Sequence, residues 1–186
     1  MKVVDEEVVL AQLVDAFGYV RRDEGCTLHQ AQLIDQSISR EISEKEYDAA
    51  KLLDPYSNWY EVPSEDIDAC DAALSHITPT GWRFYIPAYM KRAIELVDKP
   101  IWETGMTSSV IFQLTFPDND DFMQHYVLER FKLLDEQQVR AVAAVLTFIA
   151  NHLSSQTDWR EEAMTALNSY WGLESIVRST LRIKLD

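Results

Sequence analysis

Glycine, proline and cysteine are scarce in this chain of 186 residues, which contains five, six and two of them. β-Sandwiches and barrels need many turns rich in glycine and proline, so this composition disfavours an all-β fold. We expect an all-α protein instead.

The two cysteines, Cys26 and Cys70, form no C-x-x-C pair, so neither a zinc site nor a disulfide framework is indicated. Cys70 falls on an apolar stripe, and we expect a buried thiol there.

Long apolar runs are also missing. No run approaches the roughly 18 residues that a membrane-spanning helix requires. The chain begins MKVVDEEVVLAQL, which has acidic residues where a secretory signal has a basic start and an unbroken apolar core. We therefore expect a cytoplasmic protein that has no membrane partner.

Basic residues are outnumbered: 17 Lys and Arg face 31 Asp and Glu, which makes the net charge −14. Nucleic-acid binding requires clustered basic side chains, so we expect no nucleic-acid partner. Residues 41–71, which we call the acidic segment, hold ten acidic side chains and two lysines. This segment can attract a basic protein, with Glu65, Asp66 and Asp68 as candidate partner-binding residues. The alternative is a solvated surface that keeps the chain soluble.

Familiar catalytic and nucleotide-binding motifs are absent. There is no G-x-G-x-x-G, P-loop, H-E-x-x-H or G-x-S-x-G, so no catalytic residue and no cofactor is indicated. The run DNDD at 118–121 suggests a calcium loop, but Phe122 and Met123 stand where an EF-hand needs an oxygen ligand and a glycine. We reject a calcium site and expect these acids to cap a helix.

Asp121, His125 and Glu129 follow one another at intervals of four residues, so they share a helix face. Such a face can supply metal ligands or a histidine–carboxylate pair. It is also typical of a solvated stripe with ordinary contacts between side chains. No second helix that would complete a site can be identified, so we predict no metal.

Overall composition is ordinary for a globular protein, with 47% hydrophobic and 26% charged residues. A chain of this length fits one domain and can bury roughly 70% of its unfolded surface. There is no internal repeat and no Gly/Ser-rich linker. We therefore predict a single helical domain over residues 1–186.

Several helix boundaries can be located from local signals. Three capping boxes predict helix starts, because the cap side chain and the third helical residue satisfy each other's backbone N–H groups. They are Thr27 with Gln30, Ser43 with Glu46, and Asp135 with Gln138. Apolar spacing and stop signals predict helices over residues 4–17, 63–77, 78–97 and 135–153, and from Asp158 to about Tyr170.

Two segments alternate between apolar and polar residues in the manner of strands. They are VIFQLTF at 110–116 and TLRIKL at 180–185. Because one strand alone is unstable, the two segments either pair as a minor two-stranded β element or form short helices.

The stretch ITPTGWRFYIPAYMKRAI at 77–94 is the most distinctive part of the chain. Thr78 is a suitable N-cap, and Pro79 fits the first helical position. Pro87 cannot donate a backbone hydrogen bond, so the helix must kink or restart there. Arg83 projects onto the apolar side, where a guanidinium needs an acidic partner. Among the acids of the preceding helix we prefer Asp71.

Two interpretations of this stretch differ in what Arg83 does. In one, Arg83, Tyr85 and Tyr89 form a small polar pocket that binds the carboxylate of a ligand. In the other, the aromatic residues join the core and Arg83 is paired inside the protein. We favour the packing interpretation.

These residues also resemble a known family. The motif T-P-x-G-W-R-F-Y-I-P-A-Y-M at 78–90 follows a W-x-x-[IV]-P element, and LLDEQQVRAVAAVLTFIANH and the pair Tyr170-Trp171 come later. Together they are similar to a bacterial family catalogued as domain of unknown function 6714, over roughly residues 47–172. Trp82 stands where that family more often has phenylalanine. The resemblance implies a bacterial, soluble, mainly helical protein and implies no activity.

Three functional hypotheses follow. The first is a non-enzymatic acidic protein-interaction module, similar to an immunity protein or antitoxin, whose acidic segment meets a basic partner. The second is a small-ligand-binding protein or enzyme that uses Arg83, Tyr85, Tyr89 and His125. The third is a structural subunit that buries an apolar face in an oligomer. We favour the first.

Overall fold

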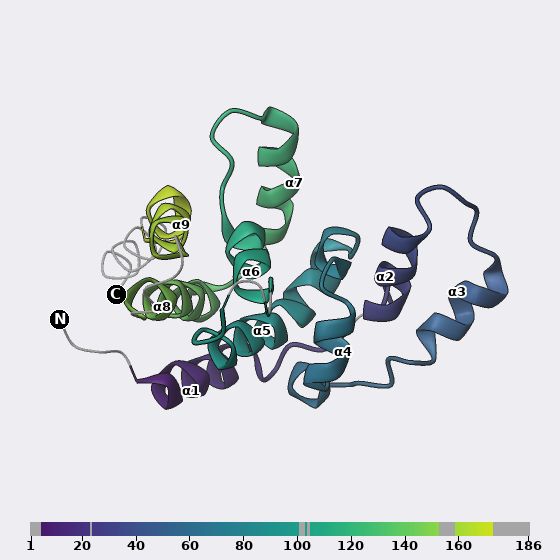
Figure 1. Cartoon of the computed structure of the whole chain (residues 1–186), viewed down its shortest axis with the longest axis horizontal. Helices are drawn as coiled ribbons and strands as arrows, with labels where there is room; N and C mark the ends of the chain where they lie inside the picture. Colours follow the sequence, from purple (N-terminus) through teal and green to yellow (C-terminus); the bar gives the residue numbers. More distant parts are fainter. Residues whose placement is uncertain (1–4, 23, 101–102, 104, 153–158, 173–186) are drawn as a thin grey trace, which may run out of the picture.

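The computed structural model describes residues 5–22, 24–100, 103, 105–152 and 159–172 (Figure 1). In this part of the chain the fold is all-α, as the sequence predicts, with no strand. The α-helices are α1 (Glu6–Phe17), α2 (Leu28–Gln36), α3 (Glu44–Lys51), α4 (Ser64–Ala69), α5 (Pro79–Glu95), α6 (Met106–Leu114), α7 (Asp121–Phe131), α8 (Glu136–Asn151) and α9 (Trp159–Ala166). Short 3-10 segments η1 (Trp59–Glu61) and η2 (Ala73–Ser75) and a π-helical turn η3 (Leu167–Trp171) complete them.

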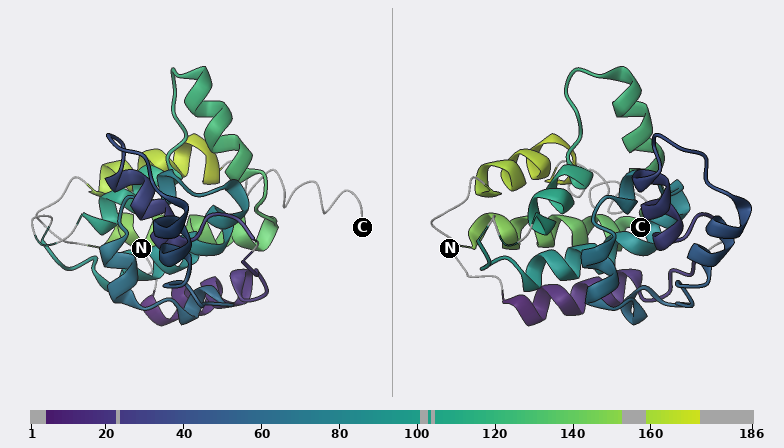
Figure 2. Two further views of the ribbon diagram at one scale, coloured as in Figure 1. Left: turned by 90° about the vertical axis from the view of Figure 1, so that its right-hand side faces the viewer. Right: turned by 45° about the vertical axis from the view of Figure 1, so that its right-hand side comes forward.

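Helix α5 forms the centre of the molecule. Eleven of its 17 residues are buried, including every aromatic side chain on it. Helices α1, α6, α7 and α8 and segment η1 pack around it, and α9 covers α6 and α8. The helices α2 and α3 lie at one edge, and α7 projects from the remaining helices in every view (Figures 1 and 2).

The start and the interior of α5 follow from its sequence. Thr78 accepts a hydrogen bond from the Gly81 amide at the N-cap, and Pro79 occupies the first helical position, as predicted. The helix continues through Pro87, so the predicted alternative of a restart at this proline is wrong. Packing on several sides holds both halves of the helix in place, although Pro87 removes one backbone hydrogen bond.

The three predicted capping boxes are confirmed. Thr27 with Gln30, Ser43 with Glu46, and Asp135 with Gln138 each make both reciprocal bonds, at the starts of α2, α3 and α8. Asp120, in the rejected calcium run, accepts from the Met123 amide and caps α7. Local hydrogen-bonding chemistry therefore sets several helix starts independently of the packing.

The structure decides one open alternative and divides one predicted helix. For residues 110–116 the helical alternative is confirmed as far as Leu114, the last residue of α6, because Val110, Ile111 and Leu114 share one buried helix face. The proposed strand partner, residues 180–185, lies outside the described residues. The predicted helix 63–77 is divided into α4 and η2, since the backbone of Cys70 leaves the helical region at φ −118 and ψ 42. Its apolar residues are still buried, and Cys70 is the buried thiol that we expected.

Candidate functional site

Arg83 lies in the interface of α5 with α1 and α8. Its Nε donates to Gln138 Oε1 over 3.0 Å, and its Nη2 donates to the Tyr19 hydroxyl over 3.3 Å. The nearest carboxylate oxygen, on Asp135, is 3.6 Å from Nη2. Because the side chain is still 27% exposed, this ion pair is partly screened by water. Arg83 is thus paired within the protein.

Tyr85 and Tyr89 lie on the other side of α5 and are fully buried. Tyr89 donates its hydroxyl to the Cys70 carbonyl, and burial raises its pKa far above the ordinary value. The Tyr85 hydroxyl lies beside the Leu28 amide without forming a hydrogen bond of good geometry. The structure therefore does not bring these two rings together with Arg83 in one pocket.

The prediction that Asp71 pairs with Arg83 is wrong, because Asp135 lies beside Arg83 instead. The acids of α4 meet Arg92 instead. Arg92 Nε and Nη2 donate to the two carboxylate oxygens of Asp68 over 2.9 and 2.6 Å. Residues nine positions apart on a helix of 3.6 residues per turn lie on opposite sides. Arg83 and Arg92 therefore meet different neighbours.

The three candidate partner-binding acids have different surroundings on α4. Glu65 is exposed. Asp66 accepts a 2.6 Å hydrogen bond from the Tyr56 hydroxyl. Burial raises the pKa of Tyr56, and this hydrogen bond adds to the effect, so that the pKa is about 12. Asp68 is held by Arg92. Two of the three acids are thus already engaged inside the protein.

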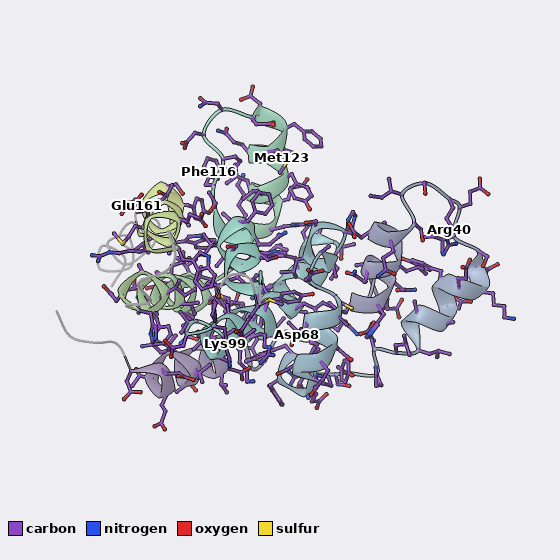
Figure 3. All side chains as sticks on the ribbon, viewed as in Figure 1. Arg40, Asp68, Lys99, Phe116, Met123 and Glu161 are labelled. Carbon is purple, nitrogen blue, oxygen red and sulfur yellow. The ribbon has the colours of Figure 1, made fainter. Side chains whose placement is uncertain are left out.

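A polar cavity of about 340 Å³ lies beside this ion pair. Its wall includes both signs of charge: Asp68, Asp71, Arg92, Lys99 and Glu103. Figure 3 shows Asp68 and Lys99 close together on this part of the surface. Charges of both signs can neutralise each other across the cavity, so it favours no ligand of one charge.

Helix α3, within the acidic segment, lies at an exposed edge of the molecule. Helix α3 packs chiefly against α2 and buries only Ala50 (Figure 1). Eight of the ten acids in the segment are exposed: Glu41, Glu44, Glu46, Asp48, Glu61, Glu65, Asp68 and Asp71. Leu52, Leu53 and Tyr60 are exposed by 81%, 56% and 52% on the same segment. Acidic groups and apolar side chains are therefore presented together.

His125 is at the surface of α7. Its side chain is 79% exposed and lies 3.4 Å from Glu129, four residues along the helix. No group of three His, Cys, Asp or Glu side chains is placed to hold a metal ion within the described ranges. Asp121, His125 and Glu129 thus lie on an exposed face of α7.

A groove between α6 and α7 was not anticipated from the sequence. It has a volume of about 390 Å³, and Phe112, Phe122, Met123 and Val127 line it together with Arg130. Arg130 is 3% exposed. The sequence contains a signal for this site, namely an arginine on the apolar side of a helix, as at Arg83. Arg130 is next to the apolar positions 127, 131 and 134.

An aromatic cluster joins distant parts of the chain at the end of α7. The Phe131 ring centroid lies 4.3 Å from Trp171, 5.0 Å from Tyr170 and 5.8 Å from Trp82. Trp171 also donates its indole N–H to the Leu114 carbonyl over 2.7 Å. The Tyr170-Trp171 pair and the motif around Trp82 thus meet at one ring.

A sequence model with the description "Family of unknown function (DUF6714)" matches residues 5–175. The chain belongs to this family. No curated protein and no solved structure matches it. In this family member, elements that carried the resemblance contribute to the core. Trp59 is buried in η1, which packs against α5, and the Phe131 ring contacts both Trp82 on α5 and the Tyr170-Trp171 pair.

The part of the chain that the structure describes contains no helix long and apolar enough to cross a membrane.

Proposed function

We propose that this family member is a non-enzymatic protein-interaction module whose acidic segment binds a basic protein, in the manner of an immunity protein or antitoxin. The observation that supports the proposal is the edge formed by α3. This helix has one buried residue, and its acids and the neighbouring apolar side chains face solvent. A helix that contributes so little to the core is available for a partner.

The chemistry of this edge suits a basic surface that carries some apolar area. Leu52, Leu53 and Tyr60 supply exposed apolar area that an interface can bury. Hydrogen bonds from Asn58 and Ser57 lower the pKa of Glu61, so that carboxylate is ionised at neutral pH. Opposite charges across an interface increase the association rate and select the partner.

The test is a charge-reversal comparison with a matched control. The basic protein that copurifies with the tagged chain from its native host is identified, purified and titrated against three forms of the chain. The first form is the unaltered chain. The second carries Glu41→Lys, Glu44→Lys and Asp48→Lys, and the control carries the same change of charge at Glu7, Glu161 and Glu162, on α1 and α9.

We expect reversal on the acidic segment to weaken binding by more than about tenfold, and the control to change it by less than about threefold. Binding must also weaken as ionic strength rises, because the contacts are exposed to solvent. Equal effects of the two triple variants contradict the proposal. Recovery of no basic partner from the native host also counts against it.

Ligand binding that uses Arg83, Tyr85 or Tyr89 stays a prediction of a second kind of function, but the three side chains do not share one pocket, and no observation favours it over the acidic edge. Oligomerisation likewise stays a prediction, which sedimentation at high protein concentration tests.

We also propose that residues 1–186 form a single domain. Limited proteolysis that leaves one resistant fragment supports it, and two stable fragments contradict it.

A further inference from the structure

The groove between α6 and α7 has a polar end and an apolar end. Ser75, Gln113, Tyr126 and Arg130 form the polar end, and Phe112, Pro117, Phe122, Met123 and Val127 line most of the rest. Phe112 and Phe122 are 67% and 77% exposed, so large rings stand open to solvent beside the groove. Figure 3 labels Met123 on the projecting helix α7 and Phe116 on the segment that follows α6. The volume of about 390 Å³ falls in the range of small-molecule sites, which is about 300–1,000 Å³.

Arg130 is the unusual member of this lining. Its side chain is 3% exposed, yet no carboxylate among the described residues forms an ion pair with it. Nη2 donates to the Ile77 carbonyl over 3.0 Å, and Nη1 reaches Gln113 Oε1 at 3.3 Å. The Nε hydrogen has no hydrogen-bond partner within the part of the chain that the structure describes. A buried guanidinium ordinarily has an anionic partner, because burying an uncompensated charge is costly.

Neighbouring groups hold the guanidinium in place without neutralising it. Its central carbon lies 4.0 Å from the centroid of the Tyr126 ring, in a cation–π contact. Tyr126 is itself fixed by a 2.6 Å hydrogen bond from its hydroxyl to the Ser75 carbonyl. Gln113 is held from its other end, since its amide nitrogen donates to the Ser75 hydroxyl over 2.9 Å. Arg130 is thus a preorganised cation at the polar end of an apolar groove.

We propose that this groove binds a small amphipathic carboxylate, in which an acyl or aryl group contacts Phe112, Phe122, Met123 and Val127 and the carboxylate meets Arg130. The carboxylate supplies an anion in direct contact with the guanidinium; within the described residues Glu129 acts on Arg130 through its charge but forms no ion pair with it. Arg130 presents N–H donors in a planar fork, which matches two carboxylate oxygens. The site is distinct from the acidic segment and does not depend on the function proposed for it.

The chemistry of the walls favours a small molecule over a peptide segment. A peptide brings backbone amides with it, and Phe112, Phe122, Met123 and Val127 offer those amides no side-chain hydrogen-bond partner. Buried amides without partners are unfavourable. Inorganic phosphate matches the guanidinium but leaves the apolar walls uncovered. An acyl carboxylate satisfies both ends of the groove.

The test compares decanoate with decan-1-ol, which has the same chain length and no charge. Binding is followed by nuclear magnetic resonance on the full chain, with ¹³C-labelled methionine methyl groups. Met123 lies in the groove, and Met164 on α9 serves as an internal control. We expect decanoate to shift the Met123 signal and leave Met164 unchanged, with decanol binding at least about tenfold more weakly.

Variants separate the two ends of the groove. Arg130→Met keeps an unbranched apolar stem at this position and removes the charged guanidinium, so the preference for decanoate over decanol must disappear. Phe122→Ala removes an exposed ring and must weaken the binding of both ligands. Ile38→Ala is the matched control for Phe122→Ala. Ile38 is 84% exposed and lies between α2 and α3, outside the groove, so this change must leave both affinities unchanged.

If Arg130→Met does not fold, the comparison of the two ligands in the unaltered chain and in Phe122→Ala still decides the matter. Equal affinity for decanoate and decanol, or binding that leaves the Met123 signal unmoved, overturns the proposal. Binding of an acidic peptide with decanoate unable to compete also overturns it.

Discussion

The side-chain amide of Gln138 joins three helices, and its closest relationship is with Arg83, whose Nε donates to Oε1 over 3.0 Å. The same oxygen accepts from the Asp135 amide over 3.2 Å, which is one half of the α8 capping box. The amide nitrogen donates to the Ala16 carbonyl over 3.1 Å, at the end of α1. Gln138 is fully buried, so a residue that first serves as a helix cap also connects α1, α5 and α8.

Gln138→Ala is therefore expected to destabilise the protein strongly. The change removes the cap contact and leaves the Ala16 carbonyl and Arg83 Nε without their partner. Each buried group that loses its hydrogen bond costs about 1–3 kcal/mol, so we expect a loss of roughly 2–4 kcal/mol. Urea unfolding measures it. Gln137→Ala, at an exposed position on the same helix, must change the stability by less than about 0.5 kcal/mol.

Arg83→Ala is expected to have a smaller effect, because its side chain is 27% exposed and its ion pair with Asp135 is partly screened. A loss of about 1 kcal/mol, seen as a lower melting temperature, fits one charged hydrogen bond to a buried amide. Lys91→Ala on the same helix, whose pair with Glu95 is on the surface, must have less effect. An Arg83→Ala protein of unchanged stability that has lost a ligand would instead support ligand binding at Arg83.

Acid should weaken the start of α3 through Glu46. Hydrogen bonds from the Ser43 hydroxyl and amide, and then from Arg40, lower the pKa of Glu46 to about 2. A carboxyl whose folded pKa is depressed stabilises the folded state above its unfolded value of about 4.3, and this contribution is lost as the pH falls toward 2. Carboxyl ¹³C shifts of Glu46 measure the titration.

Ser43→Ala removes the largest cause of that shift, so the Glu46 pKa must rise toward its ordinary value. Ser39→Ala, at an exposed serine on the loop before α3, must leave the titration unchanged. A Glu46 carboxyl that titrates near pH 4 in the unaltered protein contradicts the capping geometry.

The two thiols should differ in reactivity. Burial raises the pKa of Cys70 to about 12, with Asp54, Asp66 and Asp71 adding to the effect. At pH 8 about one Cys70 in ten thousand is then a thiolate, which is the form that reacts. Burial also raises the pKa of Cys26, but that side chain is only partly buried.

Reaction with a disulfide reagent at pH 8 should therefore modify Cys26 slowly and Cys70 only after unfolding. Cys26→Ser should abolish the reaction of the folded protein, and Cys70→Ser should leave it unchanged. Equal rates for Cys70 in folded and in urea-unfolded protein would show that the thiol is accessible in the native state.

Some features could be predicted from the sequence because their causes are local. A capping box needs two residues three positions apart, so Thr27 with Gln30 and Ser43 with Glu46 were predictable from the sequence alone. The start of α5 at Thr78 and Pro79 follows from the same kind of chemistry. The scarcity of glycine and the spacing of apolar residues predicted an all-α fold.

Other features could not be predicted because they depend on which helices meet. The alternating residues 110–116 are compatible with a strand or a helix. Residues 110–114 are helical because Val110, Ile111 and Leu114 then share one buried face of α6. Arg83 could be predicted to need an acid, but the sequence favours the acids of the preceding helix, which are near in sequence, and among them Asp71, which flanks the apolar stripe of that helix. Asp135, 52 positions further along the chain, lies there in the structure.

By itself, the sequence determined the helical class, the starts of several helices and the concentration of acids in residues 41–71, because each of these depends on neighbours along the chain. Only the tertiary structure decided the partner of Arg83, the role of Gln138 at three helices and the burial of Arg130 beside the apolar groove. These depend on side chains brought together from distant helices, whose packing is selected by the shape and burial of the whole molecule.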